Sequence, residues 1–139
     1  MIPSSRLNNL LIRIRCSLIQ YAGESWPWSA DPAAQTTVMR VVEEQKTLVS
    51  RLARLLEERG HWVEWGVYAT EFTSLHYVSL KYLLGRLTIN QREIVTVARA
   101  ILKECVGDHE ASSLIGEILT ALDREQTTLD RLNSPSQAA

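Results

Sequence analysis

The chain has 139 residues, of which 45% are hydrophobic and 22% charged, and its formal net charge is −1. This composition is typical of one globular domain over residues 1–139 and excludes a disordered chain. We expect neither nucleic acid nor a membrane as a partner, because no field of positive charge is present. The two cysteines form no disulfide framework, and no N-terminal apolar run is long enough for a signal peptide or a membrane span. A cytoplasmic protein is therefore predicted.

The first half of the chain predicts two helices. Apolar residues at helical spacing predict the first over about 5–24, with Ser4 and Ser5 as candidate N-caps. A loop rich in tryptophan and proline follows it. The second helix is predicted over 34–59, with Gly60 as the residue just beyond its C-terminus.

The second half predicts a crossover and two further helices. Residues 61–70 lack helical periodicity, and a weak period over 71–86 predicts a short helix within the crossover. Residues 88–106 are rich in Ile and Val, but their 3–4 spacing favours a helix over a strand. Asp108 is expected to cap a last helix over 109–132. The pattern predicts an all-α fold of four long helices, with a long crossover between the second and third.

Polar residues interrupt the apolar helix faces. Helical spacing places Gln45 near the middle of one such face, with Glu44 on its flank, and places Gln91 and Glu125 within two others. We predict an inner polar layer of Gln45, Gln91 and Glu125, together with Tyr21, in which an isolated Glu125 takes up a proton. Replacing Glu125 by leucine is then expected to leave thermal stability unchanged or raised.

Four stretches of the chain also carry a family resemblance. They are Leu7-Asn8-Asn9-Leu10-Leu11 with Gln20-Tyr21, Glu44-Gln45-Lys46-Thr47 with Gly60, Gly107-Asp108, and Glu125-Gln126-Thr127-Thr128. They resemble the ferritin-like superfamily, most closely bacterioferritins and the small starved-cell ferritins. The resemblance implies a ferritin-like four-helix bundle with a long connection between its second and third helices. It also implies a di-iron centre ligated by carboxylates and two histidines, with iron oxidation or storage as the activity.

Most of the ligands that the resemblance implies are replaced. Ile14 stands where the first helix should carry a glutamate, and both Glu-x-x-His motifs end in threonine, at Thr47 and Thr128. By this mapping Glu44 and Glu125 remain as remnant metal ligands. Two carboxylates cannot satisfy a di-iron centre, and a hydroxyl is a poor substitute for imidazole.

Two functions follow from this comparison. The first is a non-catalytic ferritin-like protein, a dimeric assembly or partner-binding module with no catalytic residue and no cofactor. The alternative is an iron- or manganese-binding oxidase or storage protein with an atypical ligand set, in which Glu93 or His76 joins the two remaining glutamates.

The tryptophans all fall in the two connections, at Trp26, Trp28, Trp62 and Trp65. They either cover the ends of the bundle or form an interface with a protein partner, where tryptophan is enriched. We expect the protein to be a homodimer that uses them.

Overall fold

The computed structural model describes residues 1–25 and 31–134, and within these ranges it is all-α. Its elements are α1 (Ser4–Arg15), α2 (Leu18–Ser25), α3 (Pro32–Glu58), the 3-10 helix η1 (Thr70–Tyr77), α4 (Leu80–Glu104) and α5 (His109–Leu132). The described residues contain no strand, so the prediction of an all-α fold is confirmed. None of the described helices combines the length and the apolar composition needed to cross a bilayer.

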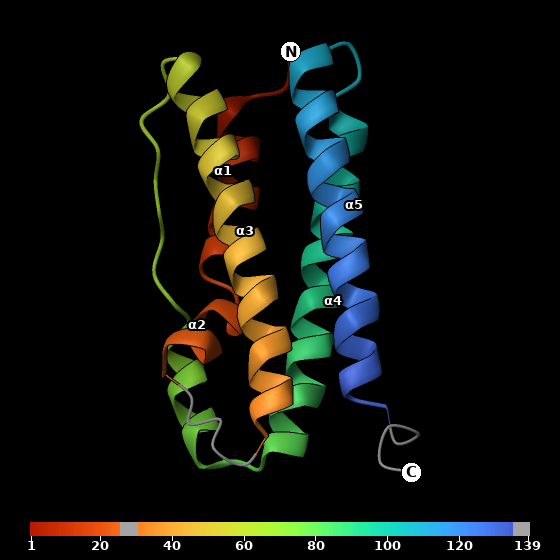
Figure 1. Cartoon of the computed structure of the whole chain (residues 1–139). Coiled ribbons are helices and arrows are strands. Elements are labelled where there is room, and N and C mark those ends of the chain that lie inside the picture. The colour runs from red at the N-terminus through yellow and green to blue at the C-terminus, as the bar shows by residue number, and fades with distance from the viewer. Residues whose placement is uncertain (26–30, 135–139) are drawn as a thin grey trace.

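The long helices lie side by side along one direction (Figure 1). α4 packs against α5, α1 against α3 and α4, α2 against α3 and α4, and α3 against α5. The connection from α3 to α4 runs back along the molecule, so α4 begins at the same end as α3 (Figure 1).

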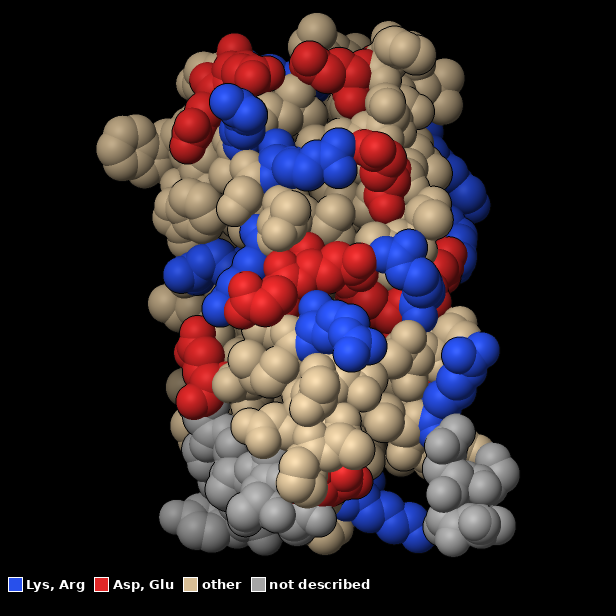
Figure 2. Space-filling model, viewed as in Figure 1, with Lys and Arg blue, Asp and Glu red and all other residues tan. Residues whose placement is uncertain are grey.

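On the face formed by α3 and α5, acidic and basic side chains are interspersed, without an extended area of one sign (Figure 2).

Side-chain caps set the start of the three long helices. Asp31, Ser79 and Asp108 each accept a hydrogen bond from a backbone N–H in the first turn, over 3.0–3.2 Å. These bonds satisfy donors that a helix start otherwise leaves open. Gly60 follows α3 with φ of 72°, a conformation that glycine adopts readily. The predicted roles of Gly60 and Asp108 are confirmed.

The first predicted helix differs from the structure in two ways. Pro3 occupies the N-cap position of α1 without a side-chain cap bond, so the prediction of a Ser4 or Ser5 cap is wrong. The expected continuous helix over 5–24 is also interrupted after Arg15. Ser17 accepts from the Gln20 backbone N–H over 3.4 Å, and Asn90 of α4 accepts from the Leu18 N–H over 3.0 Å. These two side chains stabilise the start of α2 and therefore the break.

The crossover also differs from its prediction. The expected helix over 71–86 is wrong, because η1 ends at Tyr77 and Ser79 caps a new helix. α4 therefore begins at Leu80 and not near 88.

The first part of the connection is attached to α1. The Asn8 side chain donates to the Glu64 carbonyl over 2.7 Å and accepts from the Glu64 N–H over 2.9 Å. Arg15 donates to the Trp65 carbonyl over 2.9 Å. Gly66 has φ of 74°, and a Cβ there would lie 2.6 Å from the Ile12 side chain.

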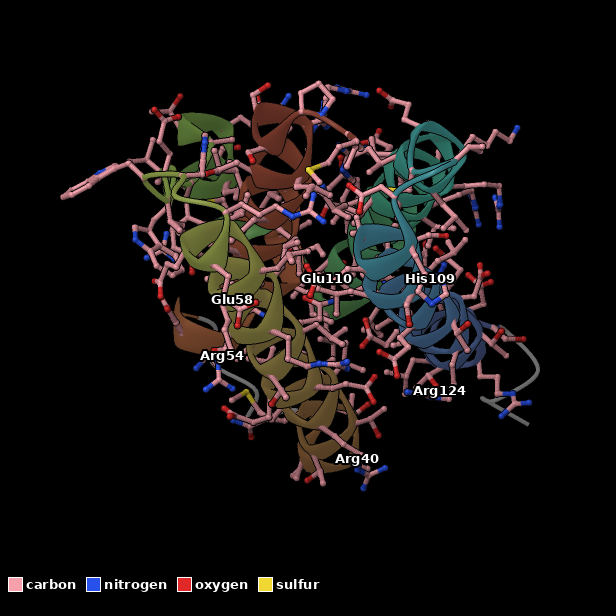
Figure 3. All side chains as sticks on the ribbon, turned by 90° about the horizontal axis from the view of Figure 1, so that it is seen from above. Arg40, Arg54, Glu58, His109, Glu110 and Arg124 are labelled. Carbon is pink, nitrogen blue, oxygen red and sulfur yellow. The ribbon has the colours of Figure 1, made fainter. Side chains whose placement is uncertain are left out.

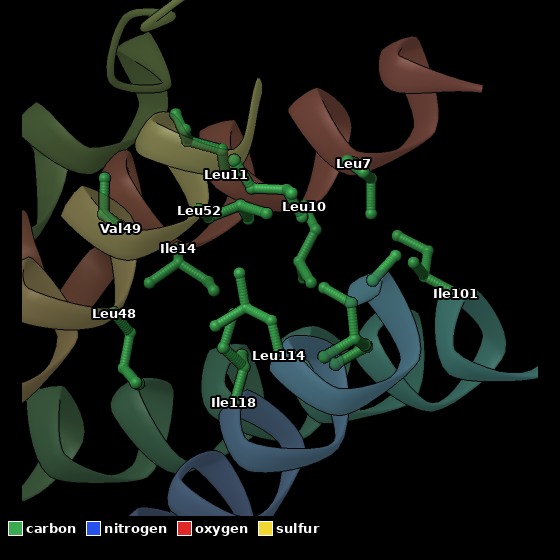
Figure 4. Close-up of a cluster of buried hydrophobic side chains, with 14 of the residues drawn as sticks. Leu7, Leu10, Leu11, Ile14, Leu48, Val49, Leu52, Ile101, Leu114 and Ile118 are labelled. Atoms are coloured by element: carbon green, nitrogen blue, oxygen red, sulfur yellow. The ribbon is translucent and has the colours of Figure 1, made fainter. Parts of the chain in front are cut away.

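Two apolar clusters form the core. The first joins α1 and the parts of α3, α4 and α5 that lie near it, and includes Leu10, Ile14, Leu52 and Ile118 (Figure 4). The second joins α2 to the other ends of α3, α4 and α5. Burying each of these leucine and isoleucine side chains contributes roughly 1.5–3 kcal/mol. Between the two clusters lies a level of polar side chains.

Candidate functional site

The polar level takes one side chain from each of four helices. Gln20 comes from α2, Gln45 from α3, Gln91 from α4 and Glu125 from α5, and all four are buried. Because buried polar groups are costly unless they are paired, the arrangement of their hydrogen bonds decides what this level can do.

The four side chains form a connected hydrogen-bond network. The Glu125 Oε1 atom accepts from Gln45 Nε2 over 2.8 Å and from Gln91 Nε2 over 3.2 Å. Gln45 Nε2 also donates to Gln91 Oε1 over 3.2 Å, and Gln45 Oε1 accepts from Gln20 Nε2 over 3.1 Å. The remaining amide hydrogens of Gln20 and Gln91 go to the carbonyls of Val42 and Leu122, each over 3.1 Å. We call these four residues the glutamine layer.

Glu125 is the only ionisable member of the glutamine layer. Burial raises its pKa to about 9, and the neighbouring Glu44 carboxylate adds to this rise. Glu125 therefore carries its proton at neutral pH. The neighbouring Glu125 carboxyl group, and further out the Arg124 guanidinium, lower the pKa of Glu44. Arg124 lies 2.6 Å from Glu44 in an ion pair at the surface.

The structure brings together Gln45, Gln91 and Glu125, the three amide and carboxyl residues predicted for the layer. In place of Tyr21, the neighbouring Gln20 supplies the fourth side chain. The Tyr21 ring packs against Tyr68, with centroids 5.2 Å apart, and against Phe72 at 5.7 Å. Gln20 was missed because the predicted first helix was continuous over 5–24, whereas the structure breaks it before Leu18.

The predicted remnant ligands, Glu44 and Glu125, lie next to each other. Other positions do not complete a metal site. The hydroxyls of Thr47 and Thr128 each donate to a carbonyl of their own helix, over 3.3 and 3.2 Å. Ile14 is fully buried in the first apolar cluster.

The remaining candidate ligands lie elsewhere. Glu93 is exposed on α4, where it lines a separate cavity with Leu18 and Phe72, and the His76 side chain is outside the described part of the chain. Among the described residues, no three His, Cys, Asp or Glu side chains are grouped to hold a metal ion. A protonated carboxyl surrounded by amides does not fit a di-iron centre.

A small cavity lies beside the layer, between α3 and α5. Its volume is about 250 Å³, and its charged lining residues are Arg40, Glu44, Arg124 and Glu125. Arg40 and Arg124 lie on the same side of the molecule, one on each of these helices (Figure 3). The sequence contains no motif that would have indicated this cavity.

The predicted interface residues are only partly described. Trp26 and Trp28 lie outside the described residues. Trp62 is 89% exposed, and Trp65 is 43% exposed with the Arg15 guanidinium 5.6 Å from its ring centroid. With Val67, which is 87% exposed, they place three large apolar side chains on the connection beside α1. We call Trp62, Trp65 and Val67 the tryptophan patch.

The chain matches no protein-family model, no curated protein and no solved structure.

Proposed function

We propose that the chain is a non-catalytic, ferritin-like four-helix bundle that works by binding a second copy of itself or another protein. The proposal treats α1 and α2 as one interrupted first helix, with α3, α4 and α5 as the other three. The long connection between α3 and α4 supports this topology, because it carries the chain back to the end at which α3 began (Figure 1).

The observation that carries the proposal is the composition of the glutamine layer. Its amide hydrogens are all directed at protein acceptors, and its one carboxyl group holds a proton. A metal ion would have to displace that proton and break these hydrogen bonds. The layer is therefore suited to holding four helices in register.

Metal analysis of protein purified without chelators tests this proposal. We expect iron and manganese far below one ion per chain, and no acceleration of ferrous oxidation. The matched variant is Glu125→Ala. A near-stoichiometric metal content that this variant loses would overturn the proposal and favour an atypical iron- or manganese-binding oxidase or storage protein. The adjacency of Glu44 and Glu125 is the observation that favours this alternative.

The tryptophan patch is the surface through which we propose that the protein binds its partner. Exposed tryptophan is enriched in interfaces because one side chain buries a large area and still offers an N–H donor. The connection that carries the patch is held against α1 by hydrogen bonds from Asn8 and Arg15, so the patch is presented in one arrangement. This rigidity lowers the entropy cost of binding.

Sedimentation velocity tests this interface. We expect a homodimer for the wild type and a monomer after the double substitution Trp62→Ser and Val67→Ser. Tyr82→Ser is the control, because Tyr82 is 53% exposed on α4, outside the patch. A monomeric wild type would contradict the homodimer, and a dimer that survives the double substitution would place its interface elsewhere.

We further propose a reducing cytoplasmic location, which suits the two free thiols of Cys16 and Cys105.

A further inference from the structure

Two arginines that differ in their pairing line the cavity between α3 and α5. Arg124 is neutralised by Glu44 at 2.6 Å. Arg40 makes no ion pair and no side-chain hydrogen bond with any residue that the structure describes. Among the described residues, Arg40 is therefore the charged group of the cavity wall that is available to pair with an added anion.

The polar groups of the cavity wall can both donate hydrogen bonds to a ligand and accept them from it. Glu125 is 2% exposed, and its Oε2 atom accepts no hydrogen bond within the described part of the chain. The Thr37 and Thr128 hydroxyls donate to the carbonyls of Ala33 and Arg124, each over 3.2 Å, so each oxygen can still accept a hydrogen bond. The guanidinium groups supply charged donors in a planar arrangement that matches carboxylate and phosphate oxygens.

The volume of the cavity limits the ligand. About 250 Å³ corresponds to roughly eight water molecules, at about 30 Å³ each. This is below the range of about 300–1,000 Å³ that is typical of sites for drug-sized molecules and cofactors. A phosphate ion or a short carboxylate is small enough to lie within this volume.

We propose that the cavity lined by Arg40, Arg124 and Glu125 is a binding site for a small oxyanion, a carboxylate or a phosphoryl group. Arg40 forms the ion pair with the anion, and Arg124 donates a second hydrogen bond while it holds Glu44. Hydroxyl groups on the ligand can donate to Thr37 and Thr128. This site goes beyond the proposed function, since it does not depend on how the protein binds its partner.

NMR titration of the isotope-labelled full chain tests the site, with inorganic phosphate and malonate as separate probes and sodium chloride at matched ionic strength. We expect saturable shifts of the backbone amides of Arg40, Arg124 and Thr128 with at least one probe, and none with chloride. Tighter binding of malonate would identify a carboxylate ligand, and tighter binding of phosphate a phosphoryl ligand.

The decisive comparison is between two arginines of α3. Arg40→Gln should weaken binding at least about tenfold, because a charged hydrogen bond is lost. Arg54→Gln is the matched control: Arg54 is also exposed, lines a different cavity, and should leave binding unchanged. Absence of saturable shifts, identical shifts with chloride, or equal weakening by both substitutions would overturn the proposal.

Discussion

At the scale of single residues, the carboxyl group of Glu125 connects the core to the surface. One of its oxygens accepts from two glutamine amides, and on its other side lies Glu44, which is paired with Arg124. The folded protein therefore favours the protonated form of Glu125, and the free energy of unfolding should depend on pH through this group.

We predict that Glu125→Gln removes this pH dependence. The unfolded chain releases the Glu125 proton near the ordinary pKa of 4.5, whereas the folded chain holds it up to about 9. Between these values, raising the pH favours the unfolded state by at most about 1.4 kcal/mol per pH unit. Glutamine keeps the oxygen acceptor and cannot ionise.

Urea unfolding of both proteins at about pH 5, 7 and 8.5 measures the effect. The stability of the variant relative to the wild type should rise with pH. A difference that stays constant over this range would show that Glu125 is ionised in the folded protein.

The hydrogen bonds of Glu125 bear on the sequence-based prediction that Glu125→Leu leaves stability unchanged or raised, which stays a prediction. Leucine would remove the acceptor of two amide hydrogens, one from Gln45 and one from Gln91. Each buried unsatisfied donor costs about 1–3 kcal/mol, which opposes the gain from burying an apolar side chain. We predict a lower melting temperature for the leucine variant than for Glu125→Gln at neutral pH. Equal melting temperatures would mean that the two amides find other acceptors.

At the scale of elements, the connection between α3 and α4 approaches α1 closely at Gly66. Gly66 combines a positive φ with a backbone that lies against Ile12 of α1 and against Cys16, the residue just after α1. A side chain at this position would both strain the backbone and push the connection away from α1.

We predict that Gly66→Ala destabilises the protein by about 1 kcal/mol more than Gly60→Ala. Gly60 is the control because it also has a positive φ, but nothing lies within 4 Å of its Cβ position. In the Gly66 variant the Glu64 amide, which donates to Asn8, should also exchange faster with solvent. Equal losses of stability in the two variants would contradict the close packing.

The sequence predicted the helices and inward-facing residues that follow from a regular local spacing of apolar residues. It did not predict features that depend on contacts between residues far apart in the chain. Gln45, Gln91 and Glu125 could be predicted because each lies in an uninterrupted helix, where a period of 3.6 determines the inward face. Gln20 could not, because the break before it has no glycine or proline signal and is stabilised by Asn90 of α4. The cavity beside Glu125 depends on how α3 and α5 approach each other, which their separate patterns do not encode.

At the scale of the whole molecule, Asp108 ties three parts of the chain together at one end of the helices. Its carboxylate caps α5, accepts from the Ile2 N–H over 3.2 Å, and pairs with Arg59 just after α3, over 2.7 Å. The hydrogen bond with Arg59 holds the pKa of Asp108 well below its ordinary value of 3.8. The pair therefore stabilises the fold above about that pH, and this contribution is lost progressively as the pH falls below it.

We predict that Asp108→Asn lowers the free energy of unfolding by roughly 3 kcal/mol at neutral pH, because it leaves the largely buried Arg59 with only the exposed and more distant carboxylate of Glu110. Glu104→Gln is the control. It breaks the Arg6–Glu104 pair, whose side chains are both 40% exposed, and should cost much less, because solvent screens an exposed pair. Urea unfolding measures both values, and similar losses would contradict a special role for the buried pair.

The bond between Asn90 and the Leu18 N–H has a consequence for the order of folding. α2 has eight residues, which is too short for a helix to persist alone in water. One of its first donors is satisfied by a side chain 72 positions further along the chain. During synthesis this segment leaves the ribosome well before α4 exists. We therefore expect α2 to become stable only after α4 has docked, although α2 is synthesised earlier.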